Sequence, residues 1–451
     1  MAVGNSITQH NTTQPSYCIN TPLSFWNRLK EHIKHYKLIT RPYYSLIRPI
    51  RNSAYKFSMK HEPFRSILLR IKNFKTCKLS TVYDYCKEHD GIIKVYDDSC
   101  EYPARPLCKT REEFETNIFA EPVMRPAYYI YVSKIRDAVI FSQEDIILAG
   151  GCFLIDRKQQ TSAYHFYIGK NVKKVTKENA LARIPRNPVV IERGIDLVKM
   201  WSGNIYHFSC EALSRLQLVD AIEEYRTWPL IVDENALKNV WSAQLLDMVN
   251  TYHHPIIALR CGEDYLVKEM IYPSFLNWEG NEALWYAPRM HKMVADYLRE
   301  KITCRHSPSR TYKNVYIPRG NNKRLLNENK VIECLKKYGF EIISQGADNY
   351  SQTLDAFMTA DNIIGIMGAS MLNTIVAKPD AMIYIITPYE YQHDNPGFAV
   401  TDASCRRLRF IAADISKLDL GAGTTKITGL NTSTFTVDIN RIEAIAKKLS
   451  S

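Results

Sequence analysis

Between residues 311 and 388, short apolar runs alternate with stretches of helical spacing, and this alternation constrains the fold more than any other feature of the chain. The apolar runs are TYKNVYI, FEIIS, NIIGIM and MIYII. Asn327 stands where a helix N-cap belongs, and Gly339 stands where a left-handed residue would end the same helix. Strands that alternate with helices of about ten residues predict an α/β fold with a parallel sheet covered on both faces.

Ligands of such sheets bind beyond the carboxyl ends of the strands. Arg319 and Arg324 follow the first of these strands around a glycine-containing turn, and Gly368, Ala369 and Ser370 follow the third at the start of a helix. A guanidinium fork and the backbone amides of a helix start both suit phosphate oxygens. We therefore expect an anion-binding cradle here, with solvated loop arginines as the alternative.

A second candidate site lies in the stretch from residue 201 to residue 226, WSGNIYHFSCEALSRLQLVDAIEEYR. Gly203 and Asn204 form a turn, and the apolar residues that follow have helical spacing. His207 and Glu211 are four residues apart, so they share one face of that helix within mutual reach. An acidic partner can hold an imidazole in the tautomer that a general base needs. The alternative is an ordinary exposed or packed pair.

Charge is concentrated at the beginning of the chain. Residues 28–78 contain 14 Lys or Arg and two acidic residues, a balance equal to the formal net charge of +12 for all 451 residues. Aromatic and aliphatic side chains are interleaved with the basic ones, a pattern that suits an anionic membrane surface. A solvated basic face packed on the globular part is the main alternative. Nucleic acid is not expected as a partner, because no recognition motif accompanies the charge.

Length and composition favour two domains in a chain that stays inside the cell. No run of about twenty apolar residues occurs, so no membrane-spanning helix is expected. The 11 cysteines are scattered without any C-x-x-C pair, which is typical of reduced thiols in the cytoplasm. We expect a basic, partly helical extension over 1–78, an α/β domain over 79–302 and a nucleotide-binding domain over 303–451. A helix over 438–450 should pack at the domain junction.

Two motif blocks give the chain a resemblance to a known family. The segment NIYHFSCEALSRL is similar to the signature Asn-Tyr-Tyr-His-Trp-Leu-x-Glu-x-Leu-Pro-Arg-Leu of glycosyltransferase family 61, and the segments YIPRGNNKRLLNE and MGASMLN resemble its later Tyr-Ile-Ser-Arg and His-Gly-Ala-Gly-x-x-Asn blocks. The resemblance extends over residues 128–388. The matching positions in these blocks are Asn204, Tyr206, His207, Glu211, Leu213, Arg215, Leu216, Tyr316, Ile317, Arg319, Arg324, Leu325, Leu326, Asn327, Glu328, Gly368, Ala369 and Asn373.

The resemblance implies a GT-B fold, in which two Rossmann-like domains face each other across a cleft. It also implies an inverting glycosyltransferase, with His207 as the base and Glu211 either orienting it or taking the role itself. The departing nucleoside diphosphate would be stabilised by Arg319, Arg324, Gly368, Ala369 and Ser370. No metal or cofactor is expected, because the chain contains no Asp-x-Asp motif for a metal-bound nucleotide.

The implied partners are a nucleotide-sugar donor and an oligosaccharide or lipid-linked saccharide acceptor. The pathway would be surface or capsular polysaccharide biosynthesis. The place would be the cytoplasm, with peripheral contact to the inner face of the membrane. Trp278 lies in an aromatic loop that suits either sugar stacking or a domain interface.

Three positions depart from the family pattern: Met367 replaces its His, Ser370 replaces a Gly, and Tyr384 replaces a Glu that would bind ribose. The remaining pocket candidates are Asn204, Asn373 and His393. These departures motivate an alternative, a catalytically inactive glycan-binding or scaffold homologue. A dinucleotide-dependent enzyme is a further alternative because Gly365-x-x-Gly368 lies near a strand end, although the full glycine motif is absent.

Overall fold

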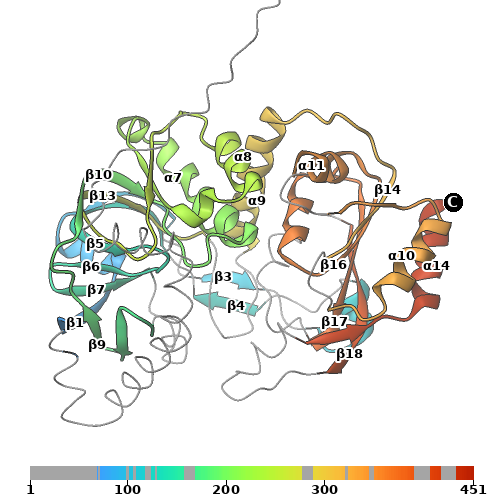
Figure 1. Ribbon diagram of the computed structural model, residues 1–451, viewed down its shortest axis with the longest axis horizontal. Coiled ribbons are helices and arrows are strands. Elements are labelled where there is room, and N and C mark those ends of the chain that lie inside the picture. Colours follow the sequence, from blue (N-terminus) through green and yellow to red (C-terminus); the bar gives the residue numbers. More distant parts are fainter. Residues whose placement is uncertain are drawn as a thin grey trace, which may run out of the picture.

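Two lobes make up the molecule, each built on one large β-sheet (Figure 1). The computed structural model describes residues 69, 72–97, 101–104, 108–116, 123–126, 129–156, 168–276, 288–319, 324–344, 350–390, 407–417 and 433–451. Most of the expected basic extension lies outside these residues. The first described strand begins at Phe74 and crosses the expected domain boundary at residue 78.

The first sheet mixes parallel and antiparallel pairs. Its order in the described residues is β12-β11-β10-β13-β5-β6-β7-β1-β9-β8, with β2 also paired to β5. The antiparallel meander predicted over residues 128–156 is confirmed as β5, β6 and β7. The strands are β1 (Phe74–Thr81), β2 (Ile92–Asp97), β5 (Ile130–Phe141), β6 (Ile147–Ala149), β7 (Cys152–Ile155), β8 (Val172–Val175), β9 (Asn179–Arg183), β10 (Val189–Asp196), β11 (Leu230–Asp233), β12 (Ile256–Leu259) and β13 (Asp264–Pro273).

Only one part of this sheet has Rossmann topology. The strands β12, β11, β10 and β13 are parallel to one another. Numbered along the chain, they have the spatial order 3-2-1-4, so the chain adds strands on one side of β10 and then on its other side, next to which β13 lies. Next to them β13 pairs antiparallel with β5. The expected Rossmann-like first domain is therefore corrected to a mixed sheet, because short turns within residues 130–155 can join only antiparallel neighbours.

The second sheet has the order β15-β14-β16-β17-β18-β19 and is parallel except for β19. Numbered along the chain, its five parallel strands have the doubly wound order 2-1-3-4-5. The side on which the next strand is added changes between β14 and β16. All four predicted strands of residues 311–388 are present. The strands are β14 (Asn314–Ile317), β15 (Glu341–Ile342), β16 (Asn362–Ile366), β17 (Met382–Pro388), β18 (Leu408–Lys417) and β19 (Thr434–Thr436).

Helices cover both faces of the second sheet because alternate strand residues point to opposite sides. Ile364 and Ile366 pack with α10 and α14, whereas Ile363 packs with α11 and η8. The helices, and the small strand pair between the lobes, are α5 (Val82–Glu88), β3 (Glu101–Ala104), α6 (Arg111–Thr116), β4 (Val123–Pro126), the π-helix η3 (His207–Ala212), the 3₁₀-helix η4 (Leu213–Arg215), α7 (Leu216–Asp220), η5 (Glu223–Tyr225), η6 (Glu234–Leu237), α8 (Val240–Val249), α9 (Pro288–Arg305), α10 (Glu328–Lys337), α11 (Tyr350–Thr359), the 3₁₀-helix η8 (Ala369–Val376) and α14 (Ile439–Ser450).

Two helices, α6 and α14, pack on the second lobe. Helix α6, expected in the first domain, lies on β18 of the second sheet, where the rings of Phe114 and Phe410 stack with centroids 4.7 Å apart. Helix α14 packs on α10 at the outer face of the second sheet, where Tyr338 donates to Glu443 at 2.9 Å, and its Arg441 forms an ion pair with Glu115 of α6. A single hydrophobic cluster nevertheless extends through both lobes.

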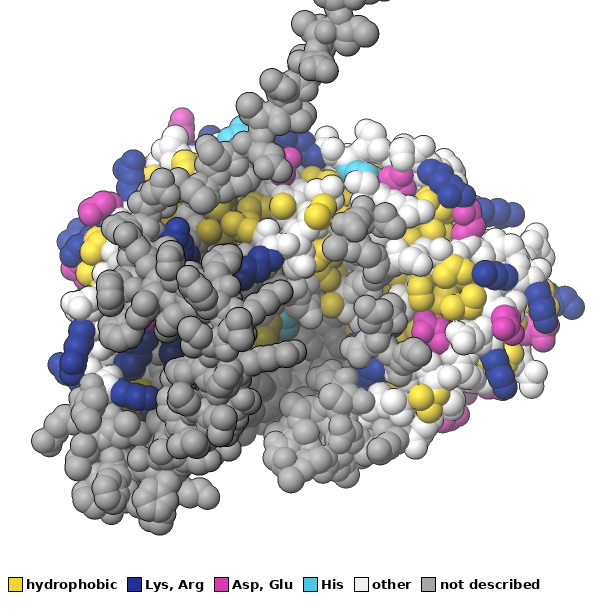
Figure 2. All heavy atoms as spheres, viewed as in Figure 1, with side chains coloured by type: hydrophobic (Ala, Val, Ile, Leu, Met, Phe, Trp, Pro, Cys, Tyr) yellow, Lys and Arg dark blue, Asp and Glu magenta, His cyan; other side chains and the backbone are white. Residues whose placement is uncertain are grey.

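Figure 2 shows Lys and Arg side chains spread over both halves of the visible face rather than gathered in one patch. Within the part of the chain that the structure describes, every helix is too short or too polar to cross a bilayer.

Candidate active site

In each sheet the strand order reverses at one point of its parallel part, and His207, Glu211, Arg319 and Gly368 of the predicted site residues lie near these two points. In the first sheet the reversal falls between β10 and β13, whose carboxyl ends are Asp196 and Pro273. In the second sheet it falls between β14 and β16, whose carboxyl ends are Ile317 and Ile366. Open α/β sheets bind ligands in the crevice at such points.

At the first reversal, the predicted pair of His207 and Glu211 is formed. His207 Nδ1 lies 2.7 Å from Glu211 Oε2, with the His207 side chain 20% exposed and that of Glu211 1% exposed. The backbone here is a π-helix followed by a 3₁₀ turn, and not the regular α-helix that the apolar spacing predicts. Single π turns of this kind are common at functional sites.

Lys199 joins this pair from the loop that follows β10. Its side chain is 2% exposed, and Nζ lies 2.5 Å from Asp145 Oδ2 and 3.5 Å from Glu211 Oε2. The ring of Phe275 lies 4.6 Å from the same ammonium. The Lys199 ammonium beside Glu211 favours the charged carboxylate, which accepts a hydrogen bond from His207 when Nδ1 carries the proton. The chain Asp145, Lys199, Glu211 and His207 thus favours that imidazole tautomer.

Arg215, which matches the family signature, is buried and holds two strands together. Its side chain is fully buried, Nε donates to the carbonyl of Pro273 at 2.7 Å, and Nη2 lies 3.3 Å from Asp196 Oδ2. Burial raises the pKa of the Asp196 carboxyl, and the Arg215 charge opposes that rise. Arg215 therefore links the carboxyl ends of β10 and β13.

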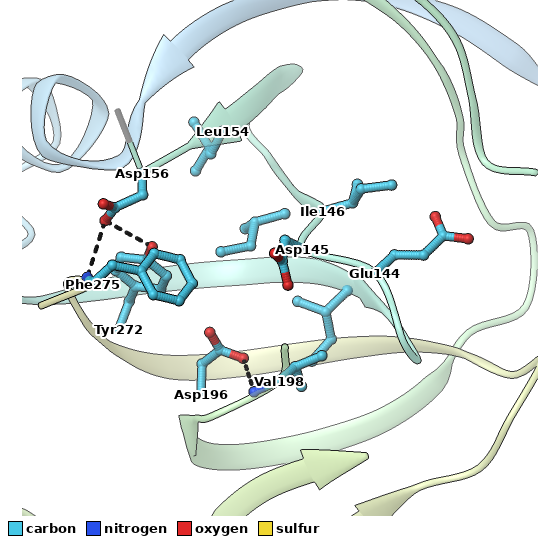
Figure 3. Close-up of a pocket in the computed structure, with 11 residues that line it drawn as sticks. Glu144, Asp145, Ile146, Leu154, Asp156, Asp196, Val198, Tyr272 and Phe275 are labelled. Atoms are coloured by element: carbon cyan, nitrogen blue, oxygen red, sulfur yellow. Dashed lines mark hydrogen bonds between the residues drawn. The ribbon is translucent and has the colours of Figure 1, made fainter. Parts of the chain in front are cut away.

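A small cavity lies beside these charges (Figure 3). Asp145 and Asp196 line it, and Asp156 accepts from Tyr272 at 2.9 Å and from the Phe275 amide at 3.4 Å. Its volume is about 30 Å³, whereas a buried water needs roughly 10–15 Å³, so the cavity can hold water but not a sugar. The described residues contain no cluster of His, Cys, Asp and Glu arranged to hold a metal ion.

Asn204 stands before the helical turn that leads into the π-helix and does not line this cavity. Its Oδ1 accepts from the Tyr206 amide at 2.9 Å, and its carbonyl accepts from the Phe208 amide at 3.0 Å. Asn204 therefore fixes the direction in which the helix bearing His207 leaves the preceding turn.

At the second reversal, Arg319 reaches across from β14 to the loop after β16. Its guanidinium donates to the carbonyl of Met367. A β-carbon added to Gly368 would lie 3.6 Å from Arg319 Cζ, so the guanidinium covers the glycine closely. The Arg319 amide donates to Glu328 Oε1 at 3.4 Å. Arg319 is thus held beside the start of η8, and its role in phosphate binding stays a prediction.

The remaining residues of the predicted cradle and the nearby pocket candidates have different surroundings. Ala369 and Ser370 begin η8, and Asn373 Nδ2 donates to the Ser370 carbonyl at 3.0 Å. Met367 is 4% exposed and belongs to the core. Tyr384 lies early in β17 and packs with the outer cluster on the α10 and α14 side, and burial raises the pKa of its hydroxyl.

Arg324 and Asn327 are both engaged by the segment around β19. Arg324 is 5% exposed, and its Nε donates to the Ser433 carbonyl at 2.9 Å. Asn327 occupies the predicted N-cap position of α10, but its side chain exchanges hydrogen bonds with the backbone of Val437 instead of with the helix. The structure does not join Arg324 to Arg319, and its role in phosphate binding stays a prediction. Trp278 and His393 lie outside the described residues.

Helix α9 connects the two reversal points, because it packs against η3 on one side and η8 on the other. Tyr297 donates to Asp220 Oδ2 at 3.0 Å, and Arg299 donates to the Ile375 carbonyl at 2.5 Å. Sequence reasoning missed Lys199, Asp145 and this role of α9. A lysine directly after an apolar strand, in IDLVK, was the one available signal for Lys199.

Residues 205–384 match the family model Glycosyltransferase 61. The match contains the His207 pair, Arg319 and Gly368, and it leaves out Lys199 and Asp145. No curated protein matches the chain.

Proposed function

We propose that this protein moves a sugar from a nucleotide-sugar donor to a hydroxyl group of a saccharide acceptor, with inversion at the anomeric carbon, because residues 205–384 match the family model Glycosyltransferase 61. The observation that supports the proposal most is the placement of one candidate catalytic group at each strand-order reversal. His207 stands at the first and Arg319 at the second. A base on one sheet and a phosphate-binding group on the other suit a GT-B arrangement.

His207 would act as the base. With Nδ1 donating to Glu211, the basic lone pair of the neutral imidazole is on Nε2. Nε2 would take the proton of the acceptor hydroxyl. The hydroxyl oxygen would bond to the anomeric carbon of the donor sugar while the bond from that carbon to the phosphate oxygen breaks. The Glu211 carboxylate stabilises the imidazolium that forms, and it is itself held by Lys199.

Arg319 and the first amides of η8 would stabilise the departing nucleoside diphosphate. A guanidinium and a helix start supply positive charge where negative charge develops, which is the role that a metal ion has in other transferases. Since the chain contains no Asp-x-Asp motif, we propose a metal-independent reaction. Gly368, Ala369 and Ser370 would supply amides, whereas Arg324 would act mainly by holding the turn.

The acceptor would be an oligosaccharide or lipid-linked saccharide in the synthesis of a surface or capsular polysaccharide. The basic and aromatic composition of residues 28–78 supports this part of the proposal, because it suits an anionic membrane surface. A cytoplasmic enzyme at the inner face of a membrane would meet both its nucleotide-sugar and a lipid-linked acceptor there.

The test is thermal stabilisation by UDP, GDP, CMP and TDP and their sugars, with Mg²⁺ and with EDTA. We expect one nucleotide class to raise the melting temperature equally in both conditions. Arg319→Gln should abolish that shift. His207→Ala should keep the shift and lower turnover by about 10²- to 10⁴-fold.

If no nucleotide raised the melting temperature, the result would contradict the transferase proposal and favour an inactive glycan-binding homologue. The replacement of the family's His and Glu by Met367 and Tyr384 gives that second candidate its support.

A further inference from the structure

Trp201 combines an exposed aromatic side chain with a strained backbone. Of the residue surface, 51% is open to solvent. Its backbone is left-handed, with φ at 61°, a conformation that bulky residues rarely adopt. Such strain persists only where the surroundings impose it, and it is concentrated at functional sites.

The surroundings do impose it, because the turn is fastened on both sides of Trp201. The Met200 amide donates to Asp145 Oδ1 at 2.6 Å, and the Ser202 hydroxyl lies 3.5 Å from Asp233 Oδ2. The Trp201 carbonyl accepts from the Asn204 amide at 2.8 Å. The indole is therefore presented at a fixed place on a turn that is anchored to the first sheet.

That place is beside the candidate base. The indole and imidazole rings of Trp201 and His207 lie with centroids 5.1 Å apart and planes tilted by 49°. A ring stacked on the indole would therefore carry its edge groups close to the imidazole. Glu211 and Lys199, the charged groups behind His207, are buried and hold the imidazole rather than the ligand.

We propose that the indole of Trp201 is the platform on which a pyranose ring of the acceptor stacks, so that one of its hydroxyl groups lies at His207. A pyranose has an apolar C–H face that fits an aromatic ring and hydroxyl groups around its edge that reach polar neighbours. A nucleobase also stacks on indole. The anion cradle for the nucleotide, however, is at Arg319 on the other sheet. The proposal rests on the function proposed above.

The experiment measures binding of maltotriose, cellotriose, xylotriose and chitotriose to the full chain by isothermal titration calorimetry. Trp201→Asn removes the indole but keeps a residue that tolerates the left-handed backbone. Trp201→Tyr keeps an aromatic face. The matched control is Tyr252→Ala, which removes an aromatic side chain of similar exposure (42%) from the loop after α8.

We expect at least one trisaccharide to bind the wild-type protein. Trp201→Asn should weaken that binding at least tenfold, while Trp201→Tyr and Tyr252→Ala should stay within about threefold. Unchanged affinity in Trp201→Asn would overturn the platform, and so would the absence of any trisaccharide binding to the wild-type protein. Loss of the nucleotide-induced thermal shift in Trp201→Asn would overturn it too, because the indole would then hold the nucleobase.

The two proposals can fail separately. A nucleotide-induced shift without trisaccharide binding would leave the transferase proposal intact and remove the platform. Trisaccharide binding that depends on Trp201, without any nucleotide-induced shift, would keep the platform as a glycan-binding site and remove the transfer reaction.

Discussion

Lys199 is the residue on which the geometry of the candidate base most depends. It lies between two carboxylates, Asp145 and Glu211, and is 2% exposed. Removing one partner of a buried ionic group leaves the other charges without compensation, which costs about 3–5 kcal/mol. We therefore expect Lys199→Met to lower the free energy of unfolding by that amount, measured by urea denaturation, and Lys199→Arg to lower it less.

The control for this variant is an exposed ion pair of the same composition. Lys268 Nζ lies 3.0 Å from Asp137 Oδ1, with side chains 45% and 66% exposed. Because solvent screens such pairs, Lys268→Met should cost less than about 1 kcal/mol. Equal effects of the two substitutions would show that Lys199 does not stabilise the network as inferred.

Asp233 gives the protein a specific dependence of stability on pH. Its pKa is raised from the ordinary value of 3.8 to about 7, mainly by burial and also by the nearby Asp145 and Asp196, while hydrogen bonds from Gln143 and Ser142 oppose the rise. At pH values between the unfolded pKa of 3.8 and the folded pKa of about 7, Asp233 holds a proton in the folded state that it has lost in the unfolded state. Stability therefore falls as pH rises towards 7, by up to about 1.4 kcal/mol per pH unit.

Asp233→Asn should remove this loss, because an amide does not titrate. Relative to the wild-type protein, the variant should gain about 2 to 3 kcal/mol between pH 5 and pH 7.5. Urea unfolding at several pH values measures the difference, and a difference that stays constant over this range would contradict the raised pKa.

At the scale of elements, the contact between β16 and η8 positions the proposed phosphate cradle. A β-carbon on Gly365 would lie 2.4 Å from Met371 Sδ and 3.3 Å from Ile317 Cβ. Gly365→Ala must therefore displace the side chain of Met371, which is buried under η8 and has little space to move into. Overpacking of this kind costs about 1–3 kcal/mol. We expect a lower melting temperature and a weaker nucleotide-induced shift.

Gly169→Ala is the matched control, since no heavy atom lies within 4 Å of the added β-carbon and the backbone there is not left-handed. If Gly365→Ala retained both the melting temperature and the nucleotide-induced shift, the packing of η8 would not position the cradle.

Elements whose signal is local could be predicted from the sequence. Strands β14, β16 and β17 are continuous apolar runs, and Gly339 ends α10 with φ at 76° as its position suggested. The pairing of His207 with Glu211 was predictable because four residues separate them. Arg324 was harder, since its partner Ser433 is more than a hundred residues away and nothing nearby in the sequence indicates that contact.

The same limit applies to the candidate site. Asp145 and Lys199 come from two separate loops of the first sheet, and only the fold brings their charges within 2.5 Å. The strained backbone of Trp201 also leaves no mark in the sequence, because left-handed conformations are predicted for Gly or Asn and not for Trp. Long-range packing, and not local propensity, therefore determines most of this site.

At the scale of the whole molecule, α6 fastens the chain of the first lobe to the second sheet. Phe114 is 2% exposed, stacks on Phe410 and meets the edge of the Tyr389 ring at a centroid distance of 5.5 Å. Around it, Arg111 Nη1 lies 3.0 Å from Asp414 Oδ1. Since one hydrophobic cluster also extends through both lobes, we expect the described lobes to unfold in a single cooperative transition.

Phe114→Ala tests this coupling, because the substitution removes the aromatic contact but leaves both sheets unaltered. Truncation of a buried Phe costs about 3–5 kcal/mol. The matched control is Tyr129→Ala, since Tyr129 is 45% exposed and stacks on Tyr83 within the first lobe. Calorimetry should show one transition in the wild-type protein and the control. In Phe114→Ala that transition should move to lower temperature or split in two. Two transitions in the wild-type protein would mean that the lobes are stable independently and that α6 does not couple them.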